Sequence, residues 1–297
     1  MRSTRSTAAN ADRHAVTGTL LGAGCGLCYA LTIVFGRSLA NAGFHTATVL
    51  GMRFGIAAVA AFVTLRVLGR PLVPEPGERV RAFLLGAIGY AVESSFFFAG
   101  LERGSAAAVV LLFYSYPAIV TIMSRQWTRR TPATLALSVG GAIVVVAASG
   151  DVHISRSGIV FALASATSFS IYLLAGARLI HKTESLTTAA WVSGGCAVSM
   201  VVRGIVTGTL QSPAGHLPQL IGNGLASGAA FALMFATLRR MGPRRTAIIM
   251  TLEALFAILL AALFLNESIG PLQLVGGAAV LTATILTGLE RETPIEA

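Results

Sequence analysis

The sequence predicts an all-α integral membrane protein in which ten transmembrane helices form two inverted five-helix repeats around a central cavity. Three observations support this fold class: ten successive apolar stretches, an uneven distribution of basic residues between the connections, and an internal repeat. The 297 residues are 55% hydrophobic and 11% charged, with a mean hydropathy of +0.76. Soluble domains carry about 25% charged residues, so the composition excludes an ordinary soluble protein.

Each apolar stretch has about 17–22 residues, enough to cross the roughly 30 Å apolar core of a bilayer as a helix. The expected bounds are 16–36, 47–65, 82–101, 105–124, 133–149, 158–177, 187–207, 218–238, 246–265 and 271–289. The first stretch exceeds the roughly 7–15 apolar residues of a signal peptide, so it is expected to remain as an anchor. The connections are short, so no extramembrane domain is expected.

Basic residues alternate between the two sides of the predicted membrane. With the N-terminus inside, the inner side holds seventeen Lys and Arg residues and the outer side four, and Arg53 lies within a stretch, which accounts for all 22. This asymmetry places both termini in the cytoplasm, and the membrane is expected to be a bacterial-type inner membrane. The net charge of +10 also fits a nucleic-acid partner. That reading is rejected, because the basic residues flank apolar stretches; the lipid bilayer is the expected partner.

The internal repeat divides the chain into units 1–150 and 151–297, with an offset near 140 residues. Matched segments are Gly18, Gly22, Tyr29 and Gly36 with Gly158, Ala162, Phe169 and Gly176; Tyr116–Ala118 with Glu253–Leu255; and Leu137–Ala142 with Gln273–Ala278. Each unit holds five stretches. Because five is odd, the second unit is inverted, and inverted repeats in transporters place the binding site near the midplane.

Three ionised residues lie well inside the stretches: Arg53, Glu93 and Glu253. Each costs about 2.5–3.5 kcal/mol at a helix centre, so each is expected to face a cavity or a partner. A rise of 1.5 Å per residue gives Arg53 and Glu93 similar depths. One interpretation is a structural ion pair; the other is that Arg53 meets a substrate carboxylate and Glu93 an ammonium group or a proton. For Glu253 a structural or gating role is favoured over substrate contact.

Pro117 is the single proline in the middle of a predicted helix. It has no backbone N–H and frees the carbonyl of Phe113, and such a break is tolerated in a membrane only where protein or a wet cavity satisfies it. Pro117 is therefore predicted to be a hinge that lines the pathway. The alternative is a static kink that aids packing.

Aromatic and hydroxyl side chains mark the expected pocket. Tyr90, Glu93 and Phe97 share one face of the third helix, and Ser165, Ser168 and Tyr172 share one face of the sixth. Further pocket candidates are Tyr114, Trp191, Ser227 and Met234. Trp191 lies near the end of a stretch, so an interfacial anchor is an equal alternative. An aromatic cavity with few charges suits amphipathic amino acids.

Glycines repeat every fourth position at Gly18, Gly22 and Gly26, and again at Gly51 and Gly55. Such spacing drives either dimerisation or close packing within one chain, so a monomer or a weak dimer is expected. The C-x-x-C pair Cys25 and Cys28 is interpreted as packing.

Several signatures of enzymes and pumps are missing from the sequence. It has no phosphate-binding loop, no His/Cys/Asp/Glu set with metal-ligand spacing and no nucleophile signature, and its five histidines lie outside the stretches. An enzyme, a cofactor and a metal site are therefore not expected.

Three segments carry a resemblance to a known family. Met52–Ala58 is similar to the second-helix R-F-x-x-A pattern of EamA-type proteins in the drug/metabolite transporter superfamily, and Ser105–Ala108 with Tyr114–Pro117 resembles that family's fourth helix. Leu252–Phe256, Leu263–Glu267 and Pro271–Leu274 resemble its ninth- and tenth-helix pattern. The chain departs from the pattern at Ala254, where a proline is usual, and at Arg129–Arg130, where an acidic residue is usual.

The resemblance implies a ten-helix secondary transporter that exports small metabolites by alternating access, with YddG-like exporters of aromatic amino acids as the nearest subtype. Amino acids are the favoured substrates, and transport is coupled to protons through Glu93 or uncoupled. The alternatives are an exporter of drugs or quaternary amines and, from another class, a membrane-embedded enzyme acting on lipids. The short connections, poor in Asp and His, disfavour the enzyme.

Overall fold

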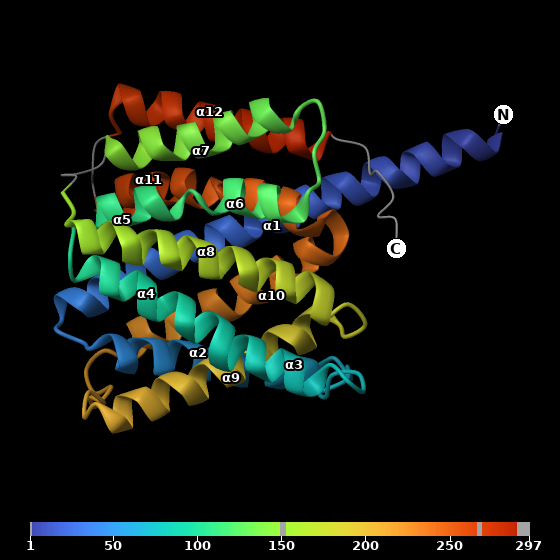
Figure 1. The fold of residues 1–297 in the computed structure, drawn as a ribbon. Coiled ribbons are helices and arrows are strands. Elements are labelled where there is room, and N and C mark those ends of the chain that lie inside the picture. Colours follow the sequence, from blue (N-terminus) through green and yellow to red (C-terminus); the bar gives the residue numbers. More distant parts are fainter. Residues whose placement is uncertain (1, 149–152, 266–268, 290–297) are drawn as a thin grey trace.

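A computed structural model describes residues 2–148, 153–265 and 269–289, and its regular structure there is helical (Figure 1). The elements in chain order are α1 (Arg2–Asn41), α2 (Thr46–Val67), α3 (Arg79–Leu84), the π-helical turn η1 (Leu85–Tyr90), α4 (Ala91–Leu101), α5 (Ala106–Phe113), α6 (Tyr116–Ser124), α7 (Thr131–Ala147), α8 (Arg156–Leu179), α9 (Ser185–Val206), α10 (Leu217–Met250), α11 (Leu252–Leu265) and α12 (Pro271–Gly288). An isolated bridge joins Gly104 to Ile154.

Seven helical segments of the described chain are long and apolar enough to cross a bilayer. They are Ala15–Gly36, Thr46–Val67, Arg79–Leu101, Arg156–Leu179, Ser185–Val206, Leu217–Met250 and Pro271–Gly288. Three shorter apolar helical segments are Ala108–Ser124, Thr131–Ala147 and Leu252–Phe264. The predicted all-α, multi-pass membrane fold is therefore confirmed at this level.

Two of the predicted stretches contain an interruption. The first separates α5 from α6 at Tyr114–Ser115, directly before Pro117, which lies in the first turn of α6. The missing N–H of this proline explains why the helix cannot run through. The second separates α10 from α11 at Thr251, whose hydroxyl donates to the carbonyl of Ile248 (2.6 Å). Threonine hydroxyls compete in this way with the backbone ladder of a helix.

Two further irregularities shape the helices. In α10, Gly242 has φ 71° and ψ 173°, which divides this element into two helices; a positive φ of this size favours glycine. In η1, the carbonyls of Gly86 and Ala87 accept hydrogen bonds from Cys196 Sγ (3.4 Å) and Ser199 Oγ (2.5 Å) of α9. The π-helical turn is therefore fixed from outside by side chains of a neighbouring helix.

The helices pack in pairs. Helix α1 lies along α10, α2 along α9, α7 along α12 and α4 along α8, whereas α3 and η1 pack mainly against α9 (Figure 1). Glycines permit the close approaches: a Cβ atom at Gly141 would lie 2.7 Å from the carbonyl oxygen of Gly276, and a Cβ at Gly276 would lie 2.7 Å from that of Gly141. Helices α7 and α12 therefore meet backbone to backbone.

The two glycine series differ in what they contact. Gly18, Gly22 and Gly26 pack inside the chain against Met241, Ile249 and the backbone of Glu253, respectively. A Cβ at Gly51 would contact Val201, whereas one at Gly55 would meet no atom within 4 Å. Packing within the chain, one of the two alternatives, is thus the role of the first series.

The connections gather at two ends of the helix bundle (Figure 1). The basic end is formed by residues 66–78, 125–131, 180–184 and 239–245, and the opposite end by 42–45, 102–105 and 207–216. Basic residues in these connections of the basic end are Arg66, Arg70, Arg125, Arg129, Arg130, Lys182, Arg239, Arg240, Arg244 and Arg245.

Candidate functional site

The centre of the bundle is filled by a cluster of aromatic side chains from six helical segments. This aromatic cluster consists of Tyr29, Phe54, Tyr90, Phe113, Tyr116, Phe169, Tyr172, Phe231 and Phe235. The ring of Tyr90 contacts three others, with centroid distances of 5.1 Å to Phe54, 5.3 Å to Phe231 and 5.7 Å to Tyr172. Edge-to-face contacts of this kind add about 0.5–1.5 kcal/mol each beyond burial.

The described residues form two grooves, and both lie away from the predicted central cavity. A groove of about 700 Å³ lies between α2, α9 and α10, and its walls include Val59 and Leu225, which are exposed on the outside of the bundle. A second groove of about 260 Å³ lies on α8 beside Met123. Neither groove is lined by a ring of the aromatic cluster. The predicted chamber at the centre of the bundle is therefore not confirmed; among the described residues, packed aromatic rings lie there.

Arg53 enters the aromatic cluster from α2. Its Nε donates a hydrogen bond to Ser227 Oγ on α10, and its guanidinium lies 5.1 Å from the centroid of the Phe54 ring. Ser227 in turn donates to the carbonyl of Asn223 (2.7 Å). Within the described part of the chain, the two terminal guanidinium nitrogens of Arg53 have no hydrogen-bond acceptor. They are free to bind an anionic group, in the paired geometry that suits a carboxylate.

Glu93 lies in the first turn of α4 and is 5% exposed. Its two carboxylate oxygens accept hydrogen bonds from Ser94 (3.1 Å) and from Ser165 of α8 (3.0 Å). Among the described residues, no ion pair joins Glu93 to Arg53, so the structure does not show the ion pair that was one of the two interpretations. Two serine hydroxyls take the place of the arginine, and hydrogen bonds to both oxygens lower the cost of burying this group.

Glu253 lies in the first turn of α11, just after the second interruption. It is half-buried, and no hydrogen bond or ion pair reaches its carboxylate from any described residue. Helix α1 packs directly on its backbone: a Cβ at Gly26 would lie 3.0 Å from the Glu253 nitrogen. Tyr29, three residues after Gly26 on α1, reaches the aromatic cluster through Phe231, with ring centroids 6.3 Å apart.

The two helix interruptions are joined to each other. Tyr116, at the start of α6, donates from its hydroxyl to the carbonyl of Ala247, four residues before Thr251 (3.1 Å). Ser170 of α8 donates to the carbonyl of Tyr116 (3.2 Å). Pro117 is buried beside this contact, in a first helical turn rather than in mid-helix. The proposed hinge thus lies at the junction of both interruptions.

Of the other predicted site residues, Phe97, Tyr114 and Met234 contact the aromatic cluster. Phe97 and Tyr114 border the aromatic cluster through Phe113, with ring centroids 5.6 Å and 6.5 Å away. Met234 joins it through the hydroxyl of Tyr29, which is 3.8 Å from the Met234 sulfur.

Ser168 and Trp191 are not brought into the aromatic cluster. Ser168 is half-buried and forms no hydrogen bond with any described residue. Trp191 donates from Nε1 to the carbonyl of Leu72 at the basic end (2.9 Å), which agrees with the anchoring alternative.

Sequence reasoning missed several residues of the cluster. Tyr29 and Phe169 carried a signal, because the repeat matches them and both lie in the cluster. Phe231 and Phe235 lie four and eight residues after Ser227, so helical spacing alone places all three on one face of α10. Buried polar atoms without a partner are harder to foresee: the Tyr172 hydroxyl and the Asn223 side-chain oxygen are examples.

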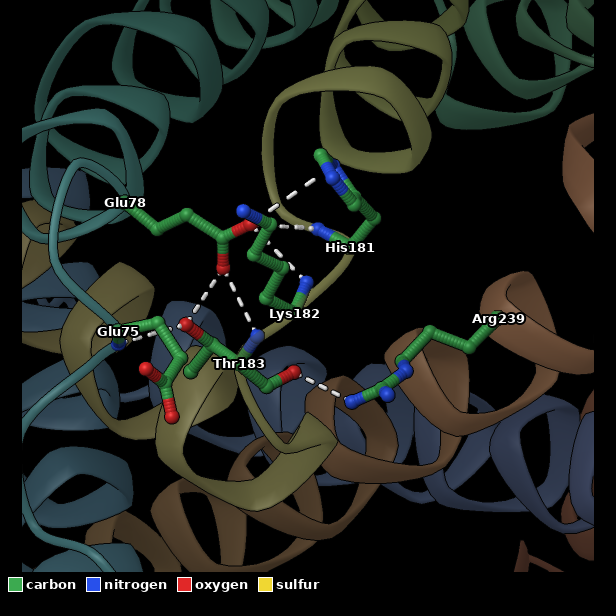
Figure 2. A network of polar contacts seen from close by, with 6 residues as sticks. All are labelled: Glu75, Glu78, His181, Lys182, Thr183 and Arg239. Carbon is green, nitrogen blue, oxygen red and sulfur yellow. Dashed lines mark hydrogen bonds and ion pairs between the residues drawn. The ribbon is translucent and has the colours of Figure 1, made fainter. Parts of the chain in front are cut away.

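The basic end holds a polar network between the two units, the basic-end clasp, defined as residues 70–78 with 181–191 and Arg239. Glu78 is its centre (Figure 2). Its carboxylate accepts from the backbone N–H groups of His181 (3.0 Å), Lys182 (3.0 Å) and Thr183 (2.8 Å) and from the Thr183 hydroxyl (2.6 Å). Burial raises the pKa of the Glu78 carboxyl, but these hydrogen bonds outweigh it and lower the pKa to about 2.

Further contacts surround Glu78 in the basic-end clasp. Arg239 of α10 donates to the carbonyl of Thr183, and Arg70 forms an ion pair with Glu184 (Figure 2 shows the first). The Thr187 hydroxyl donates to the carbonyl of Pro71 (2.7 Å). The clasp therefore joins the α2–α3 connection of the first unit to three elements of the second.

The opposite-end clasp consists of residues 43–48 with 209–211. Gln211 accepts from the backbone N–H of His45 (2.5 Å) and donates from its side chain to the carbonyl of Gly43 (3.1 Å). Thr48 donates to the carbonyl of Thr209 (3.0 Å) and accepts from the backbone N–H of Gln211 (2.9 Å). These hydrogen bonds involve neutral groups only.

Metal chemistry finds no support in the part of the chain that is described, because no group of three or more His, Cys, Asp or Glu residues there is arranged to hold an ion.

Comparisons with known proteins agree with this geometry. The sequence profile of the EamA-like transporter family matches residues 16–150 and again 156–289. The chain is 25% identical to the "Uncharacterized transporter YcbK" of Bacillus subtilis (strain 168) over 297 residues, which covers 94% of each protein. A chain in a solved crystal structure has a similar fold, with a TM-score of 0.77 at 18% identity, over 91% of this chain and 96% of that one.

Proposed function

This chain belongs to the EamA-like transporter family, and from that premise we propose that it is a secondary transporter that exports small metabolites, with amino acids as its substrates. Aromatic amino acids are the favoured members of this class, as in YddG-like exporters. The basic end is the cytoplasmic one, the membrane is the inner membrane, and both termini lie in the cytoplasm. The transporter acts as a monomer or a weak dimer.

The proposed architecture is ten spans in two inverted units, 1–150 and 151–297, that alternate access by rocking. The helix pairs support it: the second span (α2) lies along the seventh (α9), and the fifth (α7) along the tenth (α12). The interruptions at Tyr114–Ser115 and at Thr251 are separated by about the repeat offset. Interrupted spans at corresponding positions of two units are the feature that points to a transporter binding site.

One observation supports an amino-acid substrate above the others: Arg53 presents unbonded guanidinium nitrogens inside a cluster of aromatic rings. A carboxylate satisfies such nitrogens, and rings around it favour a ligand with a large apolar or aromatic side chain. Glu93, held by Ser94 and Ser165, is the candidate for proton coupling. Uncoupled transport is the alternative.

Reconstitution tests the proposal. The purified protein in liposomes loaded with phenylalanine is expected to accumulate external labelled phenylalanine by counterflow. Arg53→Ala removes the carboxylate partner and should abolish this uptake. Arg203→Ala is the matched control, because Arg203 is exposed and, among the described residues, its side chain bonds to Ser95 alone. Wild-type liposomes that move none of the twenty amino acids would refute this substrate class.

A quaternary-amine exporter is the second candidate. The observation in its favour is that two carboxyl groups lie beside the aromatic cluster, whose ring faces can attract cations. Glu93 is three residues from Tyr90, and Glu253 packs against Gly26, three residues from Tyr29. Expression in a host challenged with toxic quaternary amines separates the candidates: survival that requires Glu93 or Glu253 but not Arg53 favours amine export.

A further inference from the structure

The two carboxyl groups inside the bundle differ in what already bonds to them. Glu93 is 5% exposed, and each of its oxygens accepts from a serine hydroxyl. To bind the Glu93 carboxylate, a substrate ammonium group would have to displace the Ser94 or Ser165 hydroxyl or fit next to both of them. Glu93 is therefore satisfied by the protein itself.

Glu253 has the opposite character. It is half-buried, and its carboxylate has no hydrogen-bond or ion-pair partner among the described residues. A lone charge at this depth is costly. Its place in the first turn of α11 offsets part of that cost, because the start of a helix carries partial positive charge. The remaining hydrogen-bonding capacity of the carboxylate is available to a cation from outside the protein.

The surroundings of Glu253 belong to the same site as Arg53. Helix α1 connects them: a Cβ at Gly26 would lie 3.0 Å from the Glu253 nitrogen, and Tyr29, three residues further along α1, contacts Phe231 with ring centroids 6.3 Å apart. Phe231 stacks on Phe54 (5.5 Å between centroids), whose ring centroid lies 5.1 Å from the Arg53 guanidinium. Tyr172, whose ring contacts Tyr90, is 1% exposed, and its hydroxyl has no hydrogen-bond partner among the described residues. An unsatisfied anion, an unsatisfied cation and an unsatisfied buried hydroxyl thus share one aromatic cluster.

Resting on the proposed function, we propose that Glu253, and not Glu93, binds the ammonium group of a zwitterionic substrate whose carboxylate is bound by Arg53. The substrate class is then an α-amino acid or another compound that carries both charges. Arg53 and Glu253 do not pair with each other in the described structure, so a ligand with both charges satisfies both residues at once.

Three related probes test the assignment by direct binding to the purified full-length protein. Phenylalanine carries both charges, 3-phenylpropanoate lacks the ammonium group, and 2-phenylethylamine lacks the carboxylate. The Glu253→Gln variant is expected to weaken phenylalanine and 2-phenylethylamine at least tenfold, the loss of about one charge-assisted hydrogen bond. Binding of 3-phenylpropanoate should change by less than about threefold, since a charge-assisted bond is not lost.

Glu93→Gln is the matched control, because it removes a carboxylate from the same bundle. Glu93→Gln is expected to change the affinities for phenylalanine, 3-phenylpropanoate and 2-phenylethylamine by the same factor, because Glu93 does not contact the ammonium group in this assignment. A loss selective for the two amines in Glu93→Gln, or an equal loss for all three probes in Glu253→Gln, would overturn the assignment.

The remaining outcomes are also distinguishable. Should Glu253→Gln fail to fold, Glu253→Asp keeps the charge on a shorter side chain, and it must still weaken the two amines more than 3-phenylpropanoate. Wild-type protein that binds none of the probes refutes the proposed substrate class, and this assignment with it. Wild-type protein that binds phenylalanine while Glu253→Gln binds it equally well refutes the assignment alone.

Discussion

The two clasps join the same two units at opposite ends of the bundle, yet they are built from different chemistry. The basic-end clasp is centred on a buried carboxylate that accepts four hydrogen bonds, with an arginine and an ion pair around it. The opposite-end clasp depends on the neutral side chains of Gln211 and Thr48. Hydrogen bonds to an ionised group contribute about 1.5–3 kcal/mol and neutral ones about 0.5–1.5.

The difference has a consequence for the proposed transport cycle. Alternating access requires each end to open in turn, so each clasp must break once per cycle. The cost of opening is larger at the basic end, and the empty protein should therefore favour a state that is closed there. Four changes to the clasps test this comparison.

The largest effect is expected from Glu78→Ala. It leaves three backbone N–H groups and the Thr183 hydroxyl without an acceptor, which should cost roughly 2–3 kcal/mol. Hydrogen–deuterium exchange of segment 181–191 should rise about 30- to 150-fold, because 1.4 kcal/mol is a tenfold change, while segment 43–48 is unchanged. Glu75→Ala is the control, since the exposed Glu75 contributes only its backbone N–H. Equal effects of the two variants would contradict the role of Glu78.

The pH dependence of the same clasp follows from the lowered pKa of Glu78. A carboxyl whose pKa falls on folding contributes stability above its unfolded pKa, near 4.5, and loses it as the pH drops toward 2. The melting temperature of wild type should exceed that of Glu78→Gln by a constant margin from pH 5 to 8. The margin should shrink between about pH 4.5 and 2, with Trp191 fluorescence as the probe. A margin that varies between pH 5 and 8 would show that another group controls the clasp.

A smaller effect is expected at the other end from Gln211→Ala. This change removes the neutral hydrogen bonds to His45 and Gly43 and should cost about 1 kcal/mol. Exchange of segment 43–48 should rise several-fold, and that of segment 181–191 should stay constant. Ser212→Ala is the control, because the Ser212 hydroxyl bonds only within its own connection. If Gln211→Ala opens its end as widely as Glu78→Ala opens the other, the two clasps do not differ as described.

The smallest effect is expected from Arg70→Ala. Its ion pair with Glu184 lies at the surface, where Arg70 is 53% exposed, and exposed pairs contribute at most about 1 kcal/mol. The melting temperature should change by no more than the error of measurement, and raising the salt concentration should have no effect on the variant. A decrease in melting temperature as large as that caused by Glu78→Ala would show that Arg70 stabilises the clasp as strongly as Glu78 does.

The sequence predicted the helices well because each apolar stretch is long and carries few charges. It also predicted a break near Pro117, since proline has a local steric cause. The break at Thr251 has neither proline nor glycine beside it, so the neighbouring residues did not predict it. The repeat held the only signal, because it matches Glu253 with Tyr116.

The candidate site was only partly predictable. Depth along a helix placed Arg53 and Glu93 at one level, but depth leaves rotation about the helix axis open, and Ser227 and Ser165 bind these residues instead. The cavity prediction is not confirmed, because large side chains can line a chamber or fill it, and the composition is the same in both cases. The clasps lie mainly in connections between helices, which lack the periodic apolar pattern of a helix, so the sequence did not predict their contacts.

The π-helical turn η1, between α3 and α4, determines the rotation of α4 about its own axis and therefore the direction of each α4 side chain. Such a turn contains one residue more than an α-helical turn, and each residue of a helix accounts for about 100° of rotation. Glu93 lies three residues after η1, and in this register its carboxylate accepts a hydrogen bond from Ser165. If the π-helical turn moved along the span to a position after Glu93, Glu93 would rotate away from Ser165 by about 100° while both ends of the span kept their places. A carboxylate can thus change its facing partner by local rewinding, independently of any tilt of the whole bundle.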